Sequence, residues 1–166
     1  MRTLCLTIAL LCAAPQLAVA EPASIVPSNE AELQTLANTI RANRRALVSV
    51  NLPLTSEQAA QFWPLYEKYQ AEMNAVGDKV VALVDDYITH FKDLSDDKAL
   101  QLITDYLAAD AERIKIRQTY LPEFTKILPG RTVARFYQIE NKMDAVVKYD
   151  LAATIPVVDE SAPPKP

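Results

Sequence analysis

A run of apolar side chains between residues 59 and 87 recurs in alternating steps of three and four residues. Its members are Ala59, Phe62, Tyr66, Tyr69, Met73, Val76, Val80, Leu83 and Tyr87. A repeat of about 3.5 residues is typical of α-helices that pack side by side with a shallow left-handed crossing. A β-strand would need a period of two, which this segment lacks. The repeat predicts one helix over residues 55–90, about 50 Å long, with a bend near Pro64.

Similar patterns predict three further helices in residues 29–51, 95–127 and 131–153. Their inward positions are predicted to be Leu33, Leu36, Ile40 and Leu47 in the first, Ala99, Leu102, Tyr106, Ala109, Arg113, Ile116 and Tyr120 in the second, and Val133, Phe136, Met143 and Val147 in the third. Pro122 is expected to kink the middle one, and Leu128-Pro129-Gly130 to end it. Only two glycines are present, so the tight turns of a strand-rich fold are scarce.

The predicted fold class is therefore all-α, a long-helix antiparallel bundle of about four helices within residues 29–155. Two arrangements remain open at this point. The bundle is either closed, which buries every apolar stripe, or open and curved. Residues 21–28 are predicted to be a flexible leader, and residues 156–166 a flexible tail containing prolines.

The first twenty residues have the pattern of an export signal. A positive start at Arg2 precedes an apolar run over residues 4–14, which is too short to span a bilayer. Ala18-Val19-Ala20 matches the small-residue cleavage site of a signal peptide. Cleavage after Ala20 would place the mature protein in the periplasm without a cysteine, because Cys5 and Cys12 both lie in the signal.

The charge of the chain argues against two classes of partner. Removal of residues 1–20 takes away one arginine and no acidic residue, which changes the net charge from −4 to about −5. An acidic exported chain is a poor candidate for binding nucleic acid or anionic lipid. No apolar stretch after the signal is long enough for membrane insertion.

Leu54-Thr55-Ser56-Glu57-Gln58 stands directly before the long predicted helix. Thr55 is a good N-cap residue, and Gln58 can reach back to the Thr55 amide to complete a capping box. Leu54 stands where a hydrophobic staple begins. The pattern therefore predicts a helix start rather than a contact surface.

This LTxxQ sequence, with the export signal and the helical plan, resembles the Spy/CpxP family of periplasmic stress proteins. The Phe62-Trp63-Pro64-Leu65-Tyr66 block, the Leu-Pro-Gly turn and the block over residues 138–142 also resemble an uncharacterised group of periplasmic proteins. The resemblance implies an ATP-independent chaperone or envelope-stress protein. It further implies a curved helical dimer that offers apolar and charged side chains to unfolded envelope proteins.

The chain lacks the residue patterns of an enzyme or a metal protein. No Gly-rich phosphate loop and no activated nucleophile is present, so we expect no catalytic residue and no cofactor. His90 is the single histidine, and one histidine without a thiol is a poor transition-metal site. A metal-handling protein is the weakest of the alternatives.

Three side chains are candidate partner contacts. Trp63 falls outside the three-and-four register of its helix, and Arg113 falls inside the register of the next, where a buried arginine needs a partner. Arg117 lies one turn further along. Two hypotheses for a binding function follow: a chaperone for many unfolded clients, or an adaptor or sensor subunit for one defined envelope protein. A second copy of the chain is a further candidate partner.

Overall fold

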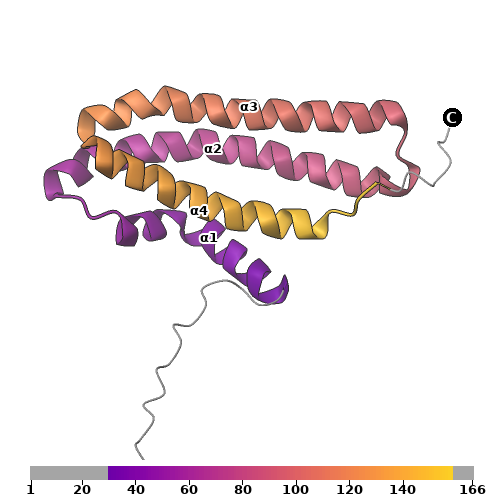
Figure 1. Cartoon of the computed structure of the whole chain (residues 1–166), viewed down its shortest axis with the longest axis horizontal. Helices are drawn as coiled ribbons and strands as arrows, with labels where there is room; N and C mark the ends of the chain where they lie inside the picture. The colour runs from indigo at the N-terminus through magenta and orange to yellow at the C-terminus, as the bar shows by residue number, and fades with distance from the viewer. Residues whose placement is uncertain (1–29, 159–166) are drawn as a thin grey trace, which may run out of the picture.

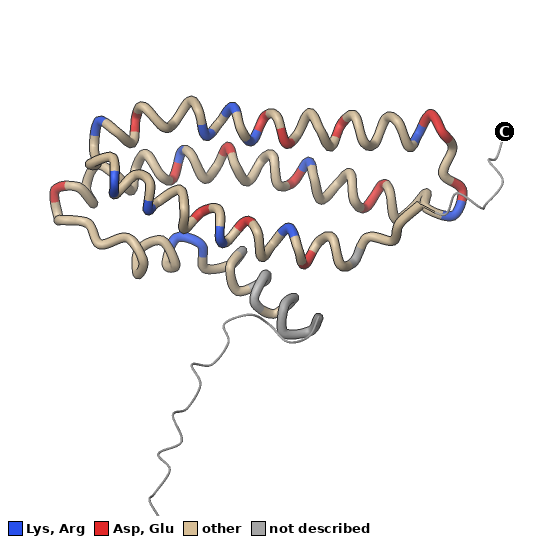
Figure 2. Tube along the Cα trace, in the orientation of Figure 1, with Lys and Arg blue, Asp and Glu red and all other residues tan. Residues whose placement is uncertain are grey.

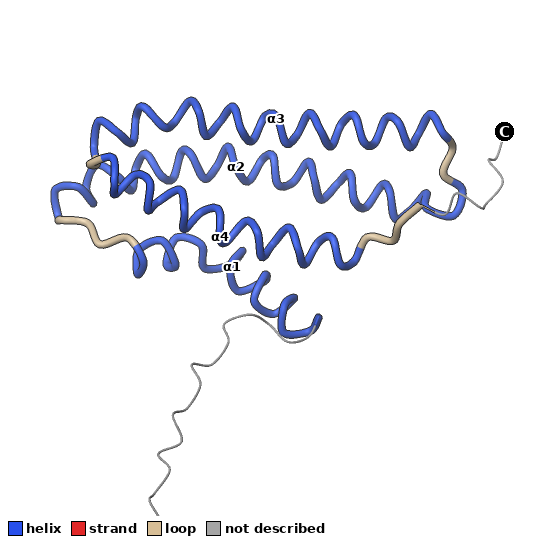
Figure 3. The backbone as a smooth tube through the Cα atoms, in the orientation of Figure 1, coloured by secondary structure: helices blue, strands red, loops and turns tan. Residues whose placement is uncertain are grey.

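The computed structural model describes residues 30–158, without the side chains of residues 30–34, 36–38, 41 and 154. The described part of the chain contains four long α-helices and no strand (Figures 1 and 3). The helices are α1 (Glu30–Asn51), α2 (Ser56–His90), α3 (Asp96–Ile127) and α4 (Gly130–Thr154), and a short 3-10 turn, η1 (Phe91–Asp93), follows α2. The predicted all-α fold is confirmed. The predicted signal, the leader, and residues 159–166 of the predicted tail lie outside the described residues.

The first layer of the fold is the antiparallel pair α2 and α3, whose lengths match across the η1 turn (Figure 1). The predicted stripe of α2 faces inward. Its buried members are Phe62, Tyr66, Tyr69, Met73, Val76 and Val80. From α3 the core receives Leu102, Ala109, Ile116 and Tyr120, which are on the predicted stripe, and the fully buried Phe124, which was not predicted. The 3.5-residue repeat thus identified the packed faces of both long helices.

The second layer is the pair α1 and α4. α4 contacts both long helices: its Phe136 ring packs against Phe62 of α2, and its Tyr137 hydroxyl donates a 2.9 Å hydrogen bond to the carbonyl oxygen of Arg117 on α3. Val133, Phe136 and Met143 of α4 are buried, as predicted, together with Ile40 of α1. The Arg135 side chain donates a hydrogen bond of 2.7 Å from Nε to the carbonyl oxygen of Asn51 and so ties the start of α4 to the end of α1. α1 is kinked at Asn43, which has non-helical backbone angles of φ −120° and ψ 18°.

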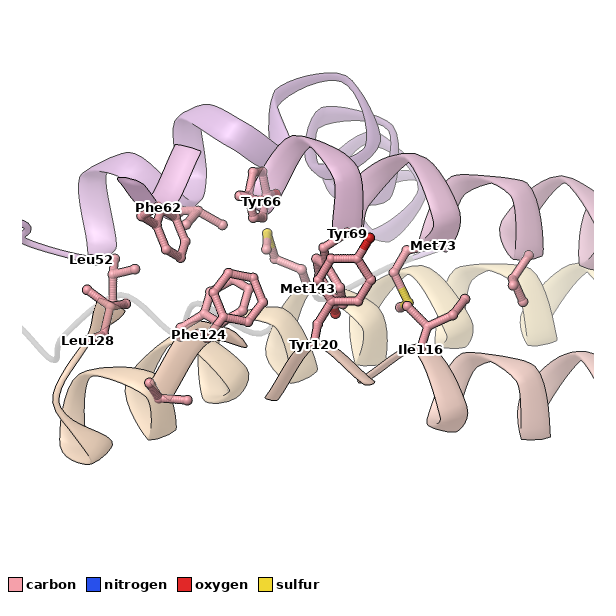
Figure 4. Close-up of a cluster of buried hydrophobic side chains, with 14 of the residues drawn as sticks. Leu52, Phe62, Tyr66, Tyr69, Met73, Ile116, Tyr120, Phe124, Leu128 and Met143 are labelled. Carbon is pink, nitrogen blue, oxygen red and sulfur yellow. The ribbon is translucent and has the colours of Figure 1, made fainter. Parts of the chain in front are cut away.

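A cluster of aromatic rings joins the two layers near the turn between α3 and α4. Phe136 of α4 lies 4.7 Å, centre to centre, from Phe124 of α3 and 5.3 Å from Phe62 of α2. Tyr69 of α2 lies 5.5 Å from Tyr120 of α3 (Figure 4). Rings at these separations pack edge-on or offset and bury large areas, so this end of the molecule is the best-filled part of the core.

α4 leaves α3 at the Pro129 turn, and the two helix axes then diverge (Figure 1), although the Lys148 side chain still reaches Asp110 of α3 at 3.2 Å. After Thr154 the chain turns back towards the end of α2, where the Tyr87 hydroxyl donates a 2.7 Å hydrogen bond to the carbonyl oxygen of Pro156. The helices are therefore closely packed at one end of the molecule and spread at the other.

Candidate functional site

An apolar groove lies at the spread end, where α2, α3 and the C-terminal segment come together. Its volume is about 310 Å³. It is lined by Leu83, Val84, Tyr87, Leu94, Ala99, Leu102, Ile103, Tyr106, Ile155 and Val158. Ile103 and Val158 are about half exposed, so the groove is open to solvent along its edge. A surface of this size and chemistry accepts apolar side chains or a small apolar ligand.

Charged residues stand beside the groove. The Lys98 ammonium donates a 2.7 Å hydrogen bond to Asp86, which joins α3 to α2 next to the lining residues Ala99 and Tyr87. This hydrogen bond from Lys98 holds the pKa of the Asp86 carboxyl below its usual range. Over the whole described chain, acidic and basic residues are spread along all four helices and gather in no single patch (Figure 2). The groove therefore combines apolar lining with a mixed polar border.

A second feature is a set of charged side chains between the two layers. Glu140 of α4 is fully buried, and its Oε2 atom lies 3.7 Å from an Nη atom of Arg44 on α1. Asp144, one turn further along α4, accepts hydrogen bonds from both Arg44 and Arg117. Arg117 also donates a 2.8 Å hydrogen bond to the side chain of Asn141. These residues link α1, α3 and α4 through ion pairs.

Glu140 is the least satisfied member of this set. Neither of its carboxylate oxygens has a hydrogen-bond partner within 3.5 Å, and the same holds for the buried hydroxyls of Tyr66 and Tyr69 among the described residues. The Tyr69 hydroxyl is nevertheless near enough to oppose the rise of the Glu140 pKa. Burial raises the pKa of the Glu140 carboxyl to about 7, against the opposing effect of Arg44. Burial also raises the pKa of both tyrosines, with a further contribution from the Glu140 charge.

A carboxyl with a pKa near neutrality is often catalytic, because it can exchange protons at working pH. Here the side chain of Glu140 has no exposed surface. It lines neither the apolar groove nor a second groove between α1 and α4, which includes Ile40 and Met143. It therefore reaches no substrate-sized space in the described structure. Its chemistry is a proton equilibrium coupled to folding.

The predicted capping box is present at the start of α2. The Thr55 hydroxyl accepts a 3.2 Å hydrogen bond from the Gln58 amide, and the Gln58 side chain accepts a 3.0 Å bond from the Thr55 amide. Leu54 is half-buried and packs against the core. Thr55 and Gln58 thus act within the chain as a helix start.

The three candidate partner contacts all have neighbours inside the chain. Trp63 packs against Phe62 and Tyr66, and the Arg45 guanidinium lies 4.7 Å from the centre of its indole ring. Arg113 is largely buried and pairs with Asp110 at 3.2 Å. Arg117 belongs to the Asp144 ion-pair set described above. The structure brings only Arg117 into a cluster, and it does not bring the three together.

Two features were missed in the sequence, although signals for both are present. Glu140 stands in the three-and-four register between Phe136 and Met143, so its position alone indicates burial. The other is an exposed face of α3 on which apolar residues recur every seven positions: Leu100, Leu107, Ile114 and Leu121. This spacing is visible in the printed sequence beside the inward stripe.

Within the described residues, no helix has the length and apolar character needed to cross a membrane, and no group of three or more acidic, histidine or cysteine side chains is placed to hold a metal ion. Comparisons of the chain with protein-family models, with curated proteins and with solved structures found no match.

Proposed function

We propose that this protein is an exported, ATP-independent binding protein that holds unfolded envelope proteins, as the resemblance to the Spy/CpxP family suggests. The observation that carries the proposal is the apolar groove at the spread end of the helices. A protein that holds unfolded chains must offer them apolar surface that folded proteins do not fill. The groove offers such surface.

The border of the groove suits the same task. The Lys98–Asp86 pair and the neighbouring exposed residue Lys92 keep charged groups in water next to the apolar lining. A bound polypeptide would place apolar side chains in the groove and leave its polar backbone facing these groups. The helical scaffold needs no nucleotide for such binding, because the surface is already open.

The test is light scattering of two unrelated denatured proteins diluted into the purified protein. We expect suppression of aggregation of both. The variant Val158→Asp places a charge in the groove lining, whereas Val157→Asp places the same charge on the neighbouring residue, which is 89% exposed and does not line the groove. We expect Val158→Asp to lose the suppression and Val157→Asp to keep it. Equal suppression by both variants, or none by the parent protein, would overturn the proposal.

A second candidate is an adaptor for one defined partner. The regular spacing of the exposed apolar residues on α3 favours it, because a fixed heptad fits one helical partner better than many flexible ones. Suppression of aggregation for only one of several clients would support this alternative.

A further inference from the structure

The second groove of the molecule lies between α1 and α4, two helices that pack side by side (Figure 1). We call it the α1–α4 groove, and its volume is about 400 Å³. Its apolar lining comes from both helices: Ile40 and Leu47 of α1, and Ile139, Met143 and Val146 of α4. Ile40 and Met143 are buried, and the other three are partly exposed, so the groove is an apolar surface open to solvent.

The kink in α1 leaves room for this groove. A straight helix would place residue 43 or 44 between Ile40 and Leu47 on the same face. Asn43 instead has non-helical backbone angles, and neither it nor Arg44 lines the groove. The Arg44 side chain is directed to Asp144, between the two helix pairs.

The two ends of the groove differ in polarity. α1 and α4 run antiparallel, because the end of α1 meets the start of α4 through the bond from Arg135 to Asn51. The lining residues at that end are polar: Asn51, Arg135 and Gln138. The lining residues at the other end are Ile40, Met143, Val146 and Thr39, and the Thr39 hydroxyl is hydrogen-bonded within its own helix. The groove therefore passes from a polar end to a mainly apolar one.

The charges of the groove are all positive. Arg135 and Lys142 line it, both are exposed, and neither forms an ion pair with a described residue. None of the lining residues is acidic. Asp144 of α4 does not line the groove and is bound by Arg44 and Arg117. Although the whole chain is acidic, this groove suits a ligand with a negative charge.

The polar end has the donors that a carboxylate needs. The Arg135 Nε atom donates to the carbonyl oxygen of Asn51, which fixes the guanidinium and leaves its two Nη groups without a described partner. Gln138 stands three positions later on the same helix face, so its side-chain amide lies beside the guanidinium. A guanidinium and an amide N–H together match a single planar carboxylate.

The dimensions of the groove favour a single chain of atoms as the rest of the ligand. From Arg135 to Val146 the groove follows α4 for about 16 Å. Its volume then gives a mean width of only about 5 Å, whereas an α-helix with its side chains is about 10–12 Å across. An extended polypeptide would find no backbone partners there, because the backbone groups of α1 and α4 are paired within their own helices. An unbranched alkyl chain has no polar groups to satisfy.

We propose that the α1–α4 groove binds one molecule of a long-chain monocarboxylate, with its carboxylate at Arg135 and Gln138 and its alkyl chain directed toward Met143 and Val146. The Lys142 stem borders the chain, while its ammonium stays in water. This inference does not rest on the proposed holding function, since no residue lines both grooves.

Calorimetric titration of the full chain with laurate, at concentrations where laurate is monomeric, tests the proposal. We expect saturable binding of one laurate per chain. Dodecylammonium has the same alkyl chain and the opposite charge, and it should bind at least about tenfold more weakly, because the charge-assisted hydrogen bonds of the carboxylate are lost. Acetate has the headgroup alone and should not bind measurably. Equal affinity for laurate and dodecylammonium would show unspecific apolar adsorption and overturn the proposal.

Two matched variants locate the alkyl chain. Val146→Asp places a charge in the lining, whereas Val50→Asp places the same charge on an α1 residue that is 83% exposed and does not line the groove. We expect Val146→Asp to weaken laurate binding at least about tenfold, because it sets a charge against the apolar chain. Val50→Asp should bind laurate like the parent chain. Circular dichroism checks that both variants keep their helicity.

Two further variants locate the headgroup. We expect Arg135→Gln to bind laurate no more tightly than dodecylammonium, while its affinity for dodecylammonium does not fall. This second measurement separates lost recognition from a lost fold, since Arg135 also ties α4 to α1. Lys142→Gln should keep the preference for laurate, because its ammonium is fully solvated. If Lys142→Gln abolishes the preference and Arg135→Gln retains it, the proposed orientation is wrong.

The remaining outcomes separate this inference from the proposed function. A parent chain that binds no laurate overturns the inference. Laurate binding that survives Val146→Asp and is lost in Val158→Asp places the alkyl chain in the other groove and also overturns it. A chain that binds laurate as expected but fails to suppress aggregation leaves the inference established and overturns only the holding function.

Discussion

Glu140 shows how one side chain can make the stability of this fold depend on pH. Its carboxyl is fully buried, its oxygens lack hydrogen bonds, and the nearest cation, Arg44, is shared with Asp144. Removal of the carboxyl from water disfavours its charged form, which is why the pKa rises from 4.5 to about 7. At pH values between 4.5 and about 7, the Glu140 carboxyl is protonated in the folded protein and ionised in the unfolded chain. The resulting stabilisation is complete below pH 4.5 and is lost as the pH rises through 7.

We therefore expect the free energy of unfolding to be higher at about pH 5.5 than at about pH 8. Over the whole range from below pH 4.5 to above pH 7, the loss of the Glu140 proton lowers the free energy of unfolding by up to about 3 kcal/mol. The variant Glu140→Gln keeps the size of the side chain and removes the charge, so its stability should be nearly the same at both pH values. At pH 8 it should exceed that of the parent protein. Urea unfolding at the two pH values measures both effects.

The control is Glu112→Gln, which removes a half-exposed carboxylate of α3 that pairs with Lys79 of α2. It should retain the pH dependence of the parent protein. If Glu140→Gln destabilises the protein at pH 8, then the Glu140 charge stabilises the fold through Arg44, and our account of its burial is wrong.

The ends of the helices are set by local contacts that can be read from the sequence. α2 begins with the reciprocal hydrogen bonds of Thr55 and Gln58, and the Ser95 hydroxyl accepts a 3.3 Å bond from the Lys98 amide at the start of α3. α3 ends before Pro129, where the Leu128 amide donates to the Phe124 carbonyl oxygen. Each of these contacts lies within one helical turn, so short-range patterns are sufficient to predict it.

We expect Thr55→Ala to lower the free energy of unfolding by about 1 kcal/mol, because it removes the N-cap of α2. Helix content should stay high, since the packed stripe of α2 is unchanged. Chemical denaturation followed by circular dichroism measures both quantities. Thr119→Ala changes an exposed threonine in the middle of α3 and should have little effect. A Thr55→Ala protein with parental stability and reduced aggregation suppression would instead make the LTxxQ motif a contact site.

The sequence was less informative where a contact depends on distant residues. Nothing in the segment around Asn43 indicates that α1 kinks there, because the pattern of residues 29–51 has no proline or glycine. At Glu140 two local signals conflict, because its place in the register favours burial and its charge favours exposure. Arg44, which lies beside it, and Arg117, which pairs with Asp144, come from other helices, and no local pattern encodes that meeting. The exposed apolar face of α3 has the same period as the inward stripe of that helix, so the two patterns overlap in the sequence.

The whole molecule consists of two helix pairs whose connection depends on a few side chains. The two helices of the α2–α3 pair pack against each other, and so do those of the α1–α4 pair. The aromatic cluster joins the two pairs near the Pro129 turn. Away from that end α4 diverges from α3, and the two helices are joined there by long polar side chains. The Lys148 ammonium, for example, lies 3.2 Å from the Asp110 carboxylate. The predicted number and order of helices were confirmed, but the choice between a closed and an open bundle depends on this divergence, which no helix encodes by itself.

Phe136 is the side chain that should matter most to the cohesion of the two pairs. It is fully buried, and its ring contacts Phe62, Tyr66 and Tyr69 of α2 as well as Phe124 of α3. We expect Phe136→Ala to lower the free energy of unfolding by about 3–5 kcal/mol, the usual cost of such a cavity. Because the lost contacts lie between the two helix pairs, the amides of the four helices should not all lose protection against hydrogen exchange equally.

Hydrogen exchange followed by mass spectrometry, helix by helix, tests this expectation. In Phe136→Ala the amides of α1 and α4 should exchange at lower denaturant concentration than those of α2 and α3. The comparison variant is Ile116→Ala, which opens a cavity in the core beside Met73 within the α2–α3 pair (Figure 4). It should weaken α2 and α3 at least as much as α1 and α4. If Phe136→Ala lowers protection equally in all four helices, the two pairs unfold as one unit, and the aromatic cluster is only part of a single cooperative core.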